Sequence, residues 1–137
     1  SIIATCEVPE SEVSSYGVIK GHPIDGYDGR VVRVEDVVEK PPREEAPSNL
    51  AIIGRYILAP EIFEALENTK PGRGGEIQIT DAIRLLLDTQ PVYAYKFEGT
   101  RYDAGDKLGF LKATVEFALK RKDLGAGFRK YLKSLKL

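Results

Sequence analysis

Leu50-Ala-Ile-Ile-Gly-Arg-Tyr-Ile-Leu58 is a nearly continuous apolar run, and it is the strongest indication of architecture in the chain. An apolar run of this length, bounded by polar segments, is typical of a strand that is covered on both faces. Pro60 and Glu61 follow almost at once, an order that favours the first turn of a helix. We expect this helix to end near Asn68. A buried strand followed directly by a helix predicts an α/β protein.

Further strands and helices are expected on both sides of this run. Alternating or β-branched patterns predict strands at 2–8, 16–20, 30–39 and 92–97. Apolar residues at helical spacing predict helices at 79–87, from 106 to about 119, and at 124–135. The resulting fold class is α/β, a mixed sheet flanked by helices with a C-terminal helical segment over 106–137. We interpret residues 1–137 as a single domain.

The length and composition of the chain exclude several classes of protein. The 137 residues are 42% hydrophobic and 30% charged, which suits a folded globular domain rather than a disordered chain. The sequence has no apolar run near the ~18 residues that a membrane span needs, so we expect no membrane partner. The net charge of −1 gives no sign of nucleic-acid binding.

The cysteine and histidine content narrows the chemistry further. Cys6 and His22 are the only residues of their kinds, so they cannot complete a zinc site made of cysteine and histidine alone. His22 lies in a turn-rich segment, which argues against a serine–histidine or cysteine–histidine nucleophile. A single cysteine cannot form an intrachain disulfide, and this fits a cytoplasmic protein.

Basic residues are concentrated near the C-terminus. Residues 107–137 contain nine Lys or Arg and two acids, Glu116 and Asp123. One interpretation is a solvated basic helical face. The other is a docking surface for an acidic region of the same protein or of another subunit.

The first candidate site lies at the end of the strand over 30–39, where Glu39 and Lys40 precede Pro41 and Pro42. A carboxylate can accept hydrogen bonds from vicinal sugar hydroxyls, and a lysine ammonium suits a phosphate. The strand twist could aim both side chains at one cleft. The residues alone also permit a surface ion pair on an edge strand.

The second candidate is Asp103, which lies between an expected strand and an expected helix. Ligands of α/β sheets bind outside the carboxyl ends of strands, and one carboxylate together with phosphate oxygens can hold Mg²⁺. The alternative is that Asp103 or Asp106 only caps the helix that follows. The residues alone leave both interpretations open.

Taken together, these segments resemble the C-terminal half of the bacterial UTP–glucose-1-phosphate uridylyltransferases, also called UDP-glucose pyrophosphorylases. The resemblance covers nearly the whole chain. Its motifs occur in the family's order: Tyr16-Gly17-Val18, Val38-Glu39-Lys40-Pro41, Ala46-Pro47-Ser48-Asn49-Leu50-Ala51-Ile52-Ile53-Gly54-Arg55-Tyr56, Gly74-Gly75-Glu76-Ile77-Gln78-Ile79-Thr80-Asp81 and Tyr102-Asp103-Ala104-Gly105-Asp106-Lys107.

The resemblance implies a Rossmann-like nucleotidyltransferase fold and the Mg²⁺-dependent formation of UDP-glucose and pyrophosphate from UTP and glucose 1-phosphate. It implies that the Gly17 amide and the Glu39 carboxylate hold glucose hydroxyls, with Tyr56 near the sugar. It also implies that Lys40 binds the sugar phosphate and that Asp103 is a catalytic metal ligand.

The chain departs from the family in one large respect. The glycine-rich stretch Gly-x-Gly-Thr-Arg, which cradles the nucleotide in the family, is absent from the sequence. We therefore expect a fragment that is inactive alone and that forms homo-oligomers, because half of a sheet domain would expose strand edges and apolar surface. The alternatives are a thymidylyltransferase fragment and a non-catalytic module that assembles with a partner or binds a sugar phosphate.

Overall fold

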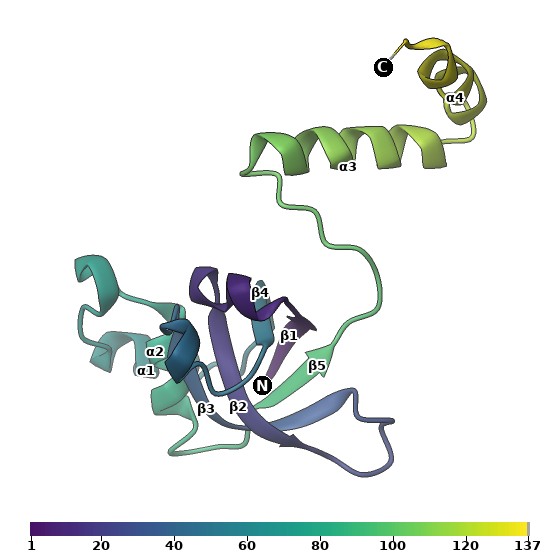
Figure 1. Cartoon of the computed structure of the whole chain (residues 1–137). Coiled ribbons are helices and arrows are strands. Elements are labelled where there is room, and N and C mark those ends of the chain that lie inside the picture. The colour runs from purple at the N-terminus through teal and green to yellow at the C-terminus, as the bar shows by residue number, and fades with distance from the viewer. Residues whose placement is uncertain (137) are drawn as a thin grey trace. The chain divides into compact units, whose positions relative to one another are not determined.

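The computed structural model describes residues 1–136, apart from the side chain of Arg73. The chain divides into two compact units, Ser1–Phe97 and Glu98–Leu137 (Figure 1). Leu137, the last residue of the expected helical segment, lies outside the described residues. The interpretation of residues 1–137 as one domain stays a prediction.

The first unit is built on five strands and two α-helices. The strands are β1 (Ile2–Glu7), β2 (Gly17–Pro23), β3 (Val31–Glu39), β4 (Leu50–Ile57) and β5 (Tyr93–Lys96). The helices are α1 (Ile62–Asn68) and α2 (Ile79–Leu86). Three short turns of 3-10 helix join them: η1 (Glu10–Ser15), η2 (Arg43–Glu45) and η3 (Arg73–Gly75). Each of these strands and α-helices lies where the sequence predicts one.

The strands pair in the order β1-β4-β2-β3-β5, and β5 pairs with β1 to close a ring. Only β1 and β5 run parallel, and the other pairs are antiparallel. The expected mixed sheet with helices is therefore confirmed, whereas its closure was not anticipated. Closure depends on β3, which pairs with β2 along its length and with β5 at Val31–Arg33.

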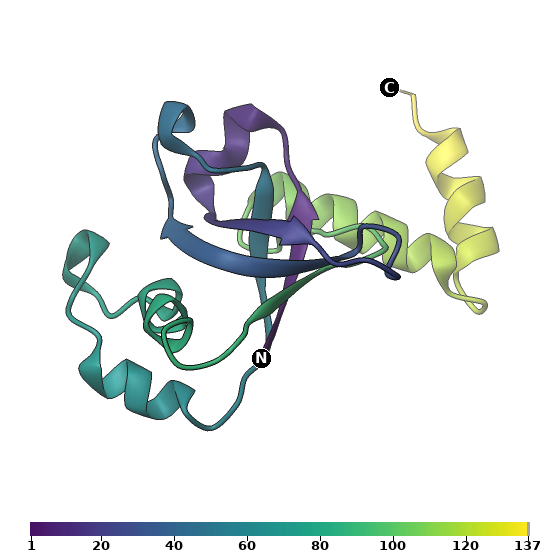
Figure 2. The ribbon, with the colours of Figure 1, turned by 90° about the horizontal axis from the view of Figure 1, so that it is seen from below.

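The core fills the space between the sheet and the two helices. Figure 2 shows α1 and α2 side by side next to the strands. Ala82, Ile83 and Leu86 of α2 are buried against strand residues such as Ile3 and Ile19. Fully burying an isoleucine or leucine side chain stabilises a fold by about 1.5–3 kcal/mol. This packing fixes α2 beside the end of β3.

The prediction that β4 is covered on both faces is wrong for its second half. Ala51 and Ile52 are buried, but Ile57 is 73% exposed. A register shift on β1 between Ile3 and Thr5 accompanies a bulge in β4, where Gly54 has a φ of 74°. The bulge changes the strand's direction, so the apolar run continues past the part that the core covers.

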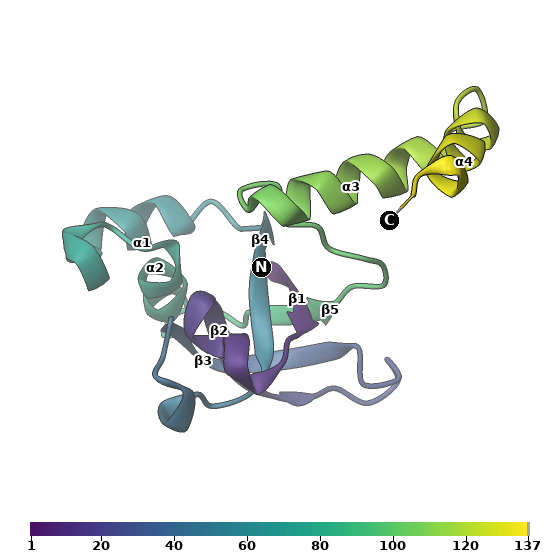
Figure 3. The same ribbon diagram turned by 45° about the horizontal axis from the view of Figure 1, so that its top comes forward.

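The second unit contains α3 (Lys107–Lys120) and α4 (Gly125–Ser134), joined by a short connection (Figure 3). Asp106 caps α3, because its Oδ2 accepts a hydrogen bond of 2.6 Å from the Gly109 amide. A Cβ on Gly125 would lie 2.5 Å from the Leu119 carbonyl oxygen, so glycine lets α4 begin directly against α3.

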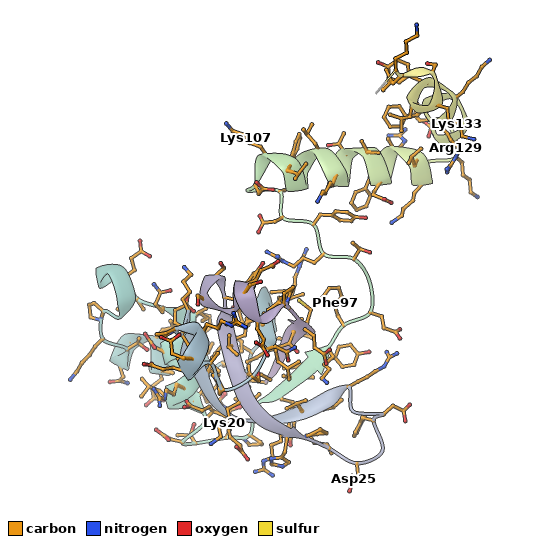
Figure 4. The ribbon with its side chains drawn as sticks, in the orientation of Figure 1. Lys20, Asp25, Phe97, Lys107, Arg129 and Lys133 are labelled. Carbon is orange, nitrogen blue, oxygen red and sulfur yellow. The ribbon has the colours of Figure 1, made fainter. Side chains whose placement is uncertain are left out.

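Lys107, Arg129 and Lys133 project from the two helices of this unit (Figure 4). These side chains belong to the basic segment that the sequence analysis identified, and both of its interpretations stay predictions. Among the described residues, neither α3 nor any other helix has the length and apolar character to cross a lipid bilayer.

Candidate functional site

Three elements bring their residues together at the end of the β2–β3 pair. Gly17, the first residue of β2, pairs in register with Glu39, the last residue of β3. Lys40 follows directly, and Thr80 comes from the first turn of α2. The Thr80 hydroxyl donates a hydrogen bond of 3.0 Å to Glu39 Oε2. The end of β3 is thus tied to the start of α2.

Glu39 and Lys40 form a close pair at this point. Glu39 Oε1 lies 3.6 Å from Lys40 Nζ, and the Glu39 side chain is only 15% exposed. A carboxylate that is mostly removed from water needs partners for its charge, and here it has an ammonium and a hydroxyl. The Lys40 side chain is 48% exposed, so this ammonium can also meet a solute.

The backbone of Lys40 explains how neighbouring side chains reach the same place. Its φ is 44°, in the left-handed region that side chains other than glycine rarely adopt. The Lys40 amide donates a hydrogen bond of 2.9 Å to the Tyr16 carbonyl, and the side chain of Pro41 is fully buried. In a regular strand, successive side chains point to opposite faces. The left-handed turn at Lys40 brings its ammonium back toward Glu39.

Gly17 leaves no room for a side chain. A Cβ there would lie 2.7 Å from Thr80 Cγ2 and 3.1 Å from Glu39 Oε2. The backbone of β2 therefore packs directly against the two side chains that the hydrogen bond joins. Any larger residue would displace the Glu39 carboxylate or the Thr80 methyl group.

A small open pocket of about 230 Å³ lies over this cluster. Its lining combines two carboxylates, an amide, an ammonium and a glycine backbone: Glu39, Lys40, Gly74, Glu76 and Gln78. Gly74 has a φ of 77° in the η3 turn, which brings this loop to the pocket. Acceptors for hydroxyl groups and a cation for a phosphate thus line one cavity.

Tyr56, on β4, lies in the same electrostatic environment. Its hydroxyl is half-buried, and burial raises the pKa of Tyr56 above its ordinary value. The negative charge of Glu39 raises this pKa further. The family resemblance implies that Tyr56 lies near the sugar, and its role there stays a prediction.

Asp103 belongs to the second unit, in the segment before α3. Its Oδ1 accepts a hydrogen bond of 3.0 Å from the Gly105 amide, and its Oδ2 lies 2.8 Å from Arg101 Nη2. The pKa of the Asp103 carboxyl lies below its ordinary value. The hydrogen bond from the Gly105 amide is the largest cause, and the Arg101 guanidinium lowers the pKa further. Because Asp106 caps α3, that cap does not need Asp103.

The metal-binding potential of the described residues is limited. Within residues 1–136, no three His, Cys, Asp or Glu side chains gather as a metal cluster. Asp103 would therefore contribute a single carboxylate. It is exposed and kept ionised, and such an oxygen donor suits Mg²⁺ when phosphate oxygens supply other ligands.

A larger pocket of about 630 Å³ lies elsewhere in the first unit. It lies at the two 3-10 turns η1 and η2, and an ion pair between Arg43 and Glu10 of 2.7 Å stands on its wall. Arg43, the cation that lines this pocket, is thus already paired with Glu10, and Glu44 adds a further carboxylate. The smaller pocket offers the better candidate, because an ammonium, two carboxylates and an amide line it beside the hydrogen bond between Thr80 and Glu39.

Three side chains of the site were not singled out from the sequence. Thr80, Glu76 and Gln78 were given no individual role. All three belong to the motif from Gly74 to Asp81, so the signal was present. Nothing in the spacing of that motif indicated that it lies against the end of β3.

A sequence profile of the nucleotidyl transferase family matches residues 1–120. Two similar proteins are named UTP–glucose-1-phosphate uridylyltransferase. The one from Streptococcus pneumoniae is 54% identical over 132 residues, which are 96% of this chain and 44% of the relative. The one from Bacillus subtilis is 54% identical over 124 residues, 90% of this chain and 41% of the relative. The chain thus spans less than half the length of these relatives.

Solved structures of similar proteins agree with this result. A UDP-glucose pyrophosphorylase complexed with UDP-glucose is 50% identical, with a TM-score of 0.81 over 88% of this chain and 44% of that one. A UTP-bound enzyme from Acinetobacter baumannii is 40% identical, with a TM-score of 0.84 over 98% of this chain and 45% of that one.

Proposed function

Because the chain belongs to the nucleotidyl transferase family, we propose that it forms the sugar-phosphate-binding part of a UTP–glucose-1-phosphate uridylyltransferase. The observation that carries this proposal is the convergence of Glu39, Lys40, Gly17 and Thr80 beside one polar pocket. The names of the relatives support uridylyl transfer rather than thymidylyl transfer.

The proposed reaction converts UTP and α-D-glucose 1-phosphate to UDP-glucose and pyrophosphate. A phosphate oxygen of glucose 1-phosphate attacks the α-phosphorus of UTP in line, the new P–O bond forms, and pyrophosphate leaves. The reaction needs no covalent enzyme intermediate. The protein's contribution is to position the two substrates and to neutralise their charge.

The residues of the pocket suit the sugar phosphate. The Lys40 ammonium would pair with the phosphate, and Glu39 would accept hydrogen bonds from glucose hydroxyls. The Gly17 amide would donate to a hydroxyl from the floor of the site, and Tyr56 would lie beside the sugar. The pairing of Lys40 with Glu39 before substrate arrives keeps both charges partly compensated.

We propose Mg²⁺ as the cofactor and Asp103 as a ligand to it. The ion would neutralise charge on the nucleotide phosphates. Asp103 fits this role as an ionised and exposed carboxylate. The Arg101 guanidinium beside it would have to share Asp103 with the metal.

We also propose that the chain corresponds to the part of the enzyme that follows the glycine-rich nucleotide loop, the C-terminal half. The support is that the chain covers less than half of its relatives and contains no Gly-x-Gly-Thr-Arg stretch. The chain alone is then expected to release no pyrophosphate from UTP and glucose 1-phosphate. The lone Cys6 favours the cytoplasm as its proposed location.

A chimera tests the proposal. The chain replaces the 132-residue segment that it matches in the Streptococcus pneumoniae enzyme, and UDP-glucose formation is measured. We expect a folded chimera that makes UDP-glucose, and a Lys40→Ala chimera with strongly reduced turnover. A folded chimera without activity, or with activity that does not depend on Lys40, would overturn the proposed function.

A further inference from the structure

We propose that Thr80 is a positioning residue that fixes the Glu39 carboxylate in the orientation needed to bind the sugar. This inference rests on the proposed function, because it concerns the same pocket. It assigns a task to a residue that the sequence analysis left without one. It is argued from the burial of Thr80, the contact of its hydroxyl with Glu39 and the packing around that contact.

Thr80 is placed rigidly. It is 3% exposed, and its hydroxyl donates to Glu39 Oε2 at 3.0 Å. The helix that carries it is held to β3 by a bidentate ion pair, in which Arg84 Nε lies 2.8 Å from Asp36 Oδ1 and Arg84 Nη2 lies 3.2 Å from Asp36 Oδ2. The donor and the acceptor therefore stand on two elements with a fixed spacing.

The two oxygens of the Glu39 carboxylate have different partners. Oε2 is occupied by Thr80, whereas Oε1 faces the Lys40 ammonium at 3.6 Å. A free glutamate side chain could exchange its oxygens and turn about its last bond. A carboxylate with one oxygen held presents the other in one direction, and this removes the entropy cost of ordering it when the sugar binds.

Gly17 completes the restraint from the opposite side. The position of its missing Cβ lies 2.7 Å from the Thr80 methyl group and 3.1 Å from Glu39 Oε2. The β2 backbone therefore blocks movement of both side chains toward that strand. Hydroxyl, carboxylate and backbone form one packed unit, in which Thr80 acts on the sugar through Glu39.

Two conservative substitutions of Thr80 in the full 137-residue chain test this inference. Thr80→Val keeps the shape and loses the hydroxyl, and Thr80→Ser keeps the hydroxyl. We expect Thr80→Val to weaken the binding of α-D-glucose 1-phosphate, measured by calorimetry, by about tenfold, and Thr80→Ser to restore most of the affinity. Thr69→Val is the matched control, because the buried Thr69 hydroxyl bonds to the Ala65 carbonyl at 2.8 Å on another helix.

A double-mutant cycle separates positioning from direct contact. If Thr80 acts through Glu39, Thr80→Val should cause no further loss in a Glu39→Ala background. A further loss there would mean that Thr80 touches the sugar itself, and it would overturn the inference. Equal losses in Thr80→Val and Thr80→Ser would also overturn it, because packing rather than the hydroxyl would then be responsible.

A second readout requires no ligand. Burial raises the Tyr56 pKa most and the Glu39 charge raises it further, so this pKa, followed by NMR with labelled tyrosine, responds to the position of the Glu39 carboxylate. Thr80→Val should move this pKa toward its value in Glu39→Ala, and Thr69→Val should leave it unchanged. If the wild-type chain binds no glucose 1-phosphate but Thr80→Val still moves the Tyr56 pKa, the proposed function is refuted, while the positioning of Glu39 by Thr80 is retained. No movement would refute the inference.

Discussion

Lys40 shows how a single backbone angle can decide whether two adjacent residues act together. With a φ of 44°, the residue leaves the strand geometry that would separate its side chain from that of Glu39. A non-glycine residue in this region costs of order 1 kcal/mol, and such residues concentrate at functional sites. The buried Pro41 and the hydrogen bond to the Tyr16 carbonyl hold the angle in place.

The first prediction concerns the Lys40 ammonium. Lys40→Ala should weaken binding of glucose 1-phosphate by about 1.5–3 kcal/mol, because a charge-assisted hydrogen bond to the phosphate is lost. Calorimetry on the 137-residue chain measures the effect. Lys20→Ala is the control, since Lys20 is also an exposed lysine near a glutamate, 4.0 Å from Glu35. Equal affinities for both variants would reduce the Lys40–Glu39 pair to a surface ion pair.

The second prediction concerns Tyr56 at high pH. Burial and the Glu39 charge raise its pKa, so the folded state keeps the phenol proton where the unfolded state has lost it. The ionisation of Tyr56 therefore leaves the free energy of unfolding unchanged below about pH 10, the ordinary tyrosine pKa. Above that pH, it lowers the free energy of unfolding as the pH rises. Tyr56→Phe should flatten that fall in urea-unfolding curves. An identical fall in the variant would assign it to other groups.

The third prediction concerns Asp103 in the active chimera. Asp103→Asn removes the negative charge and nearly keeps the shape, so turnover should fall by more than about tenfold and the Mg²⁺ requirement should rise. Because Asp106 supplies the cap of α3, the melting temperature should change little. A lower melting temperature with unchanged turnover would make Asp103 a structural residue.

Sequence reasoning found Glu39 and Lys40 but neither Glu76 nor the contacts that hold the pair in place. Glu39 and Lys40 were predicted because a carboxylate and an ammonium end a strand together. Thr80 was missed because its hydroxyl acts across 41 positions of the sequence, and no local pattern reports such a contact. The left-handed angle at Lys40 was missed for a similar reason, since propensity disfavours it and tertiary packing imposes it.

At the scale of elements, the strands and helices were predictable because their apolar spacing is local. The closure of the sheet was not, because it depends on pairs such as Val31 with Tyr95 that lie far apart in the chain. The β4 bulge at Gly54 was also invisible, since the apolar run continues through it. Hydrophobicity indicated a strand but not the point at which the core stops covering it.

The fourth prediction concerns Thr5 in β1. Its side chain is fully buried, and within residues 1–136 its hydroxyl has no hydrogen-bond partner. Thr5→Val replaces that hydroxyl by a methyl group of similar size and keeps a β-branched residue in the strand. We expect a gain of about 1 kcal/mol in the free energy of unfolding, measured with urea. A loss of stability would reveal a bound water that satisfies the hydroxyl.

At the scale of the whole molecule, the first unit exposes a continuous apolar surface. Ile2, Tyr27 and Tyr95 are 43%, 55% and 40% exposed, and they line a groove of about 380 Å³. Ile57, which pairs with Ile2, is 73% exposed. Open strand edges and exposed apolar surface were both expected from the sequence to drive association. Because the strands pair in a ring, this apolar surface is the stronger reason.

The last prediction is that the chain self-associates through this surface. Sedimentation equilibrium at ~10–50 μM, where interfaces of micromolar affinity are populated, should show a dimer or a larger species. Tyr95→Asp should shift the monomer–oligomer equilibrium toward the monomer, because burying an unpaired carboxylate in an apolar contact is costly. Phe117→Asp on α3 tests the other surface, the basic helical segment. If Phe117→Asp lowers self-association and Tyr95→Asp does not, the contact lies in the basic helical segment and not in the apolar groove. A wild-type chain that stays monomeric contradicts self-association altogether.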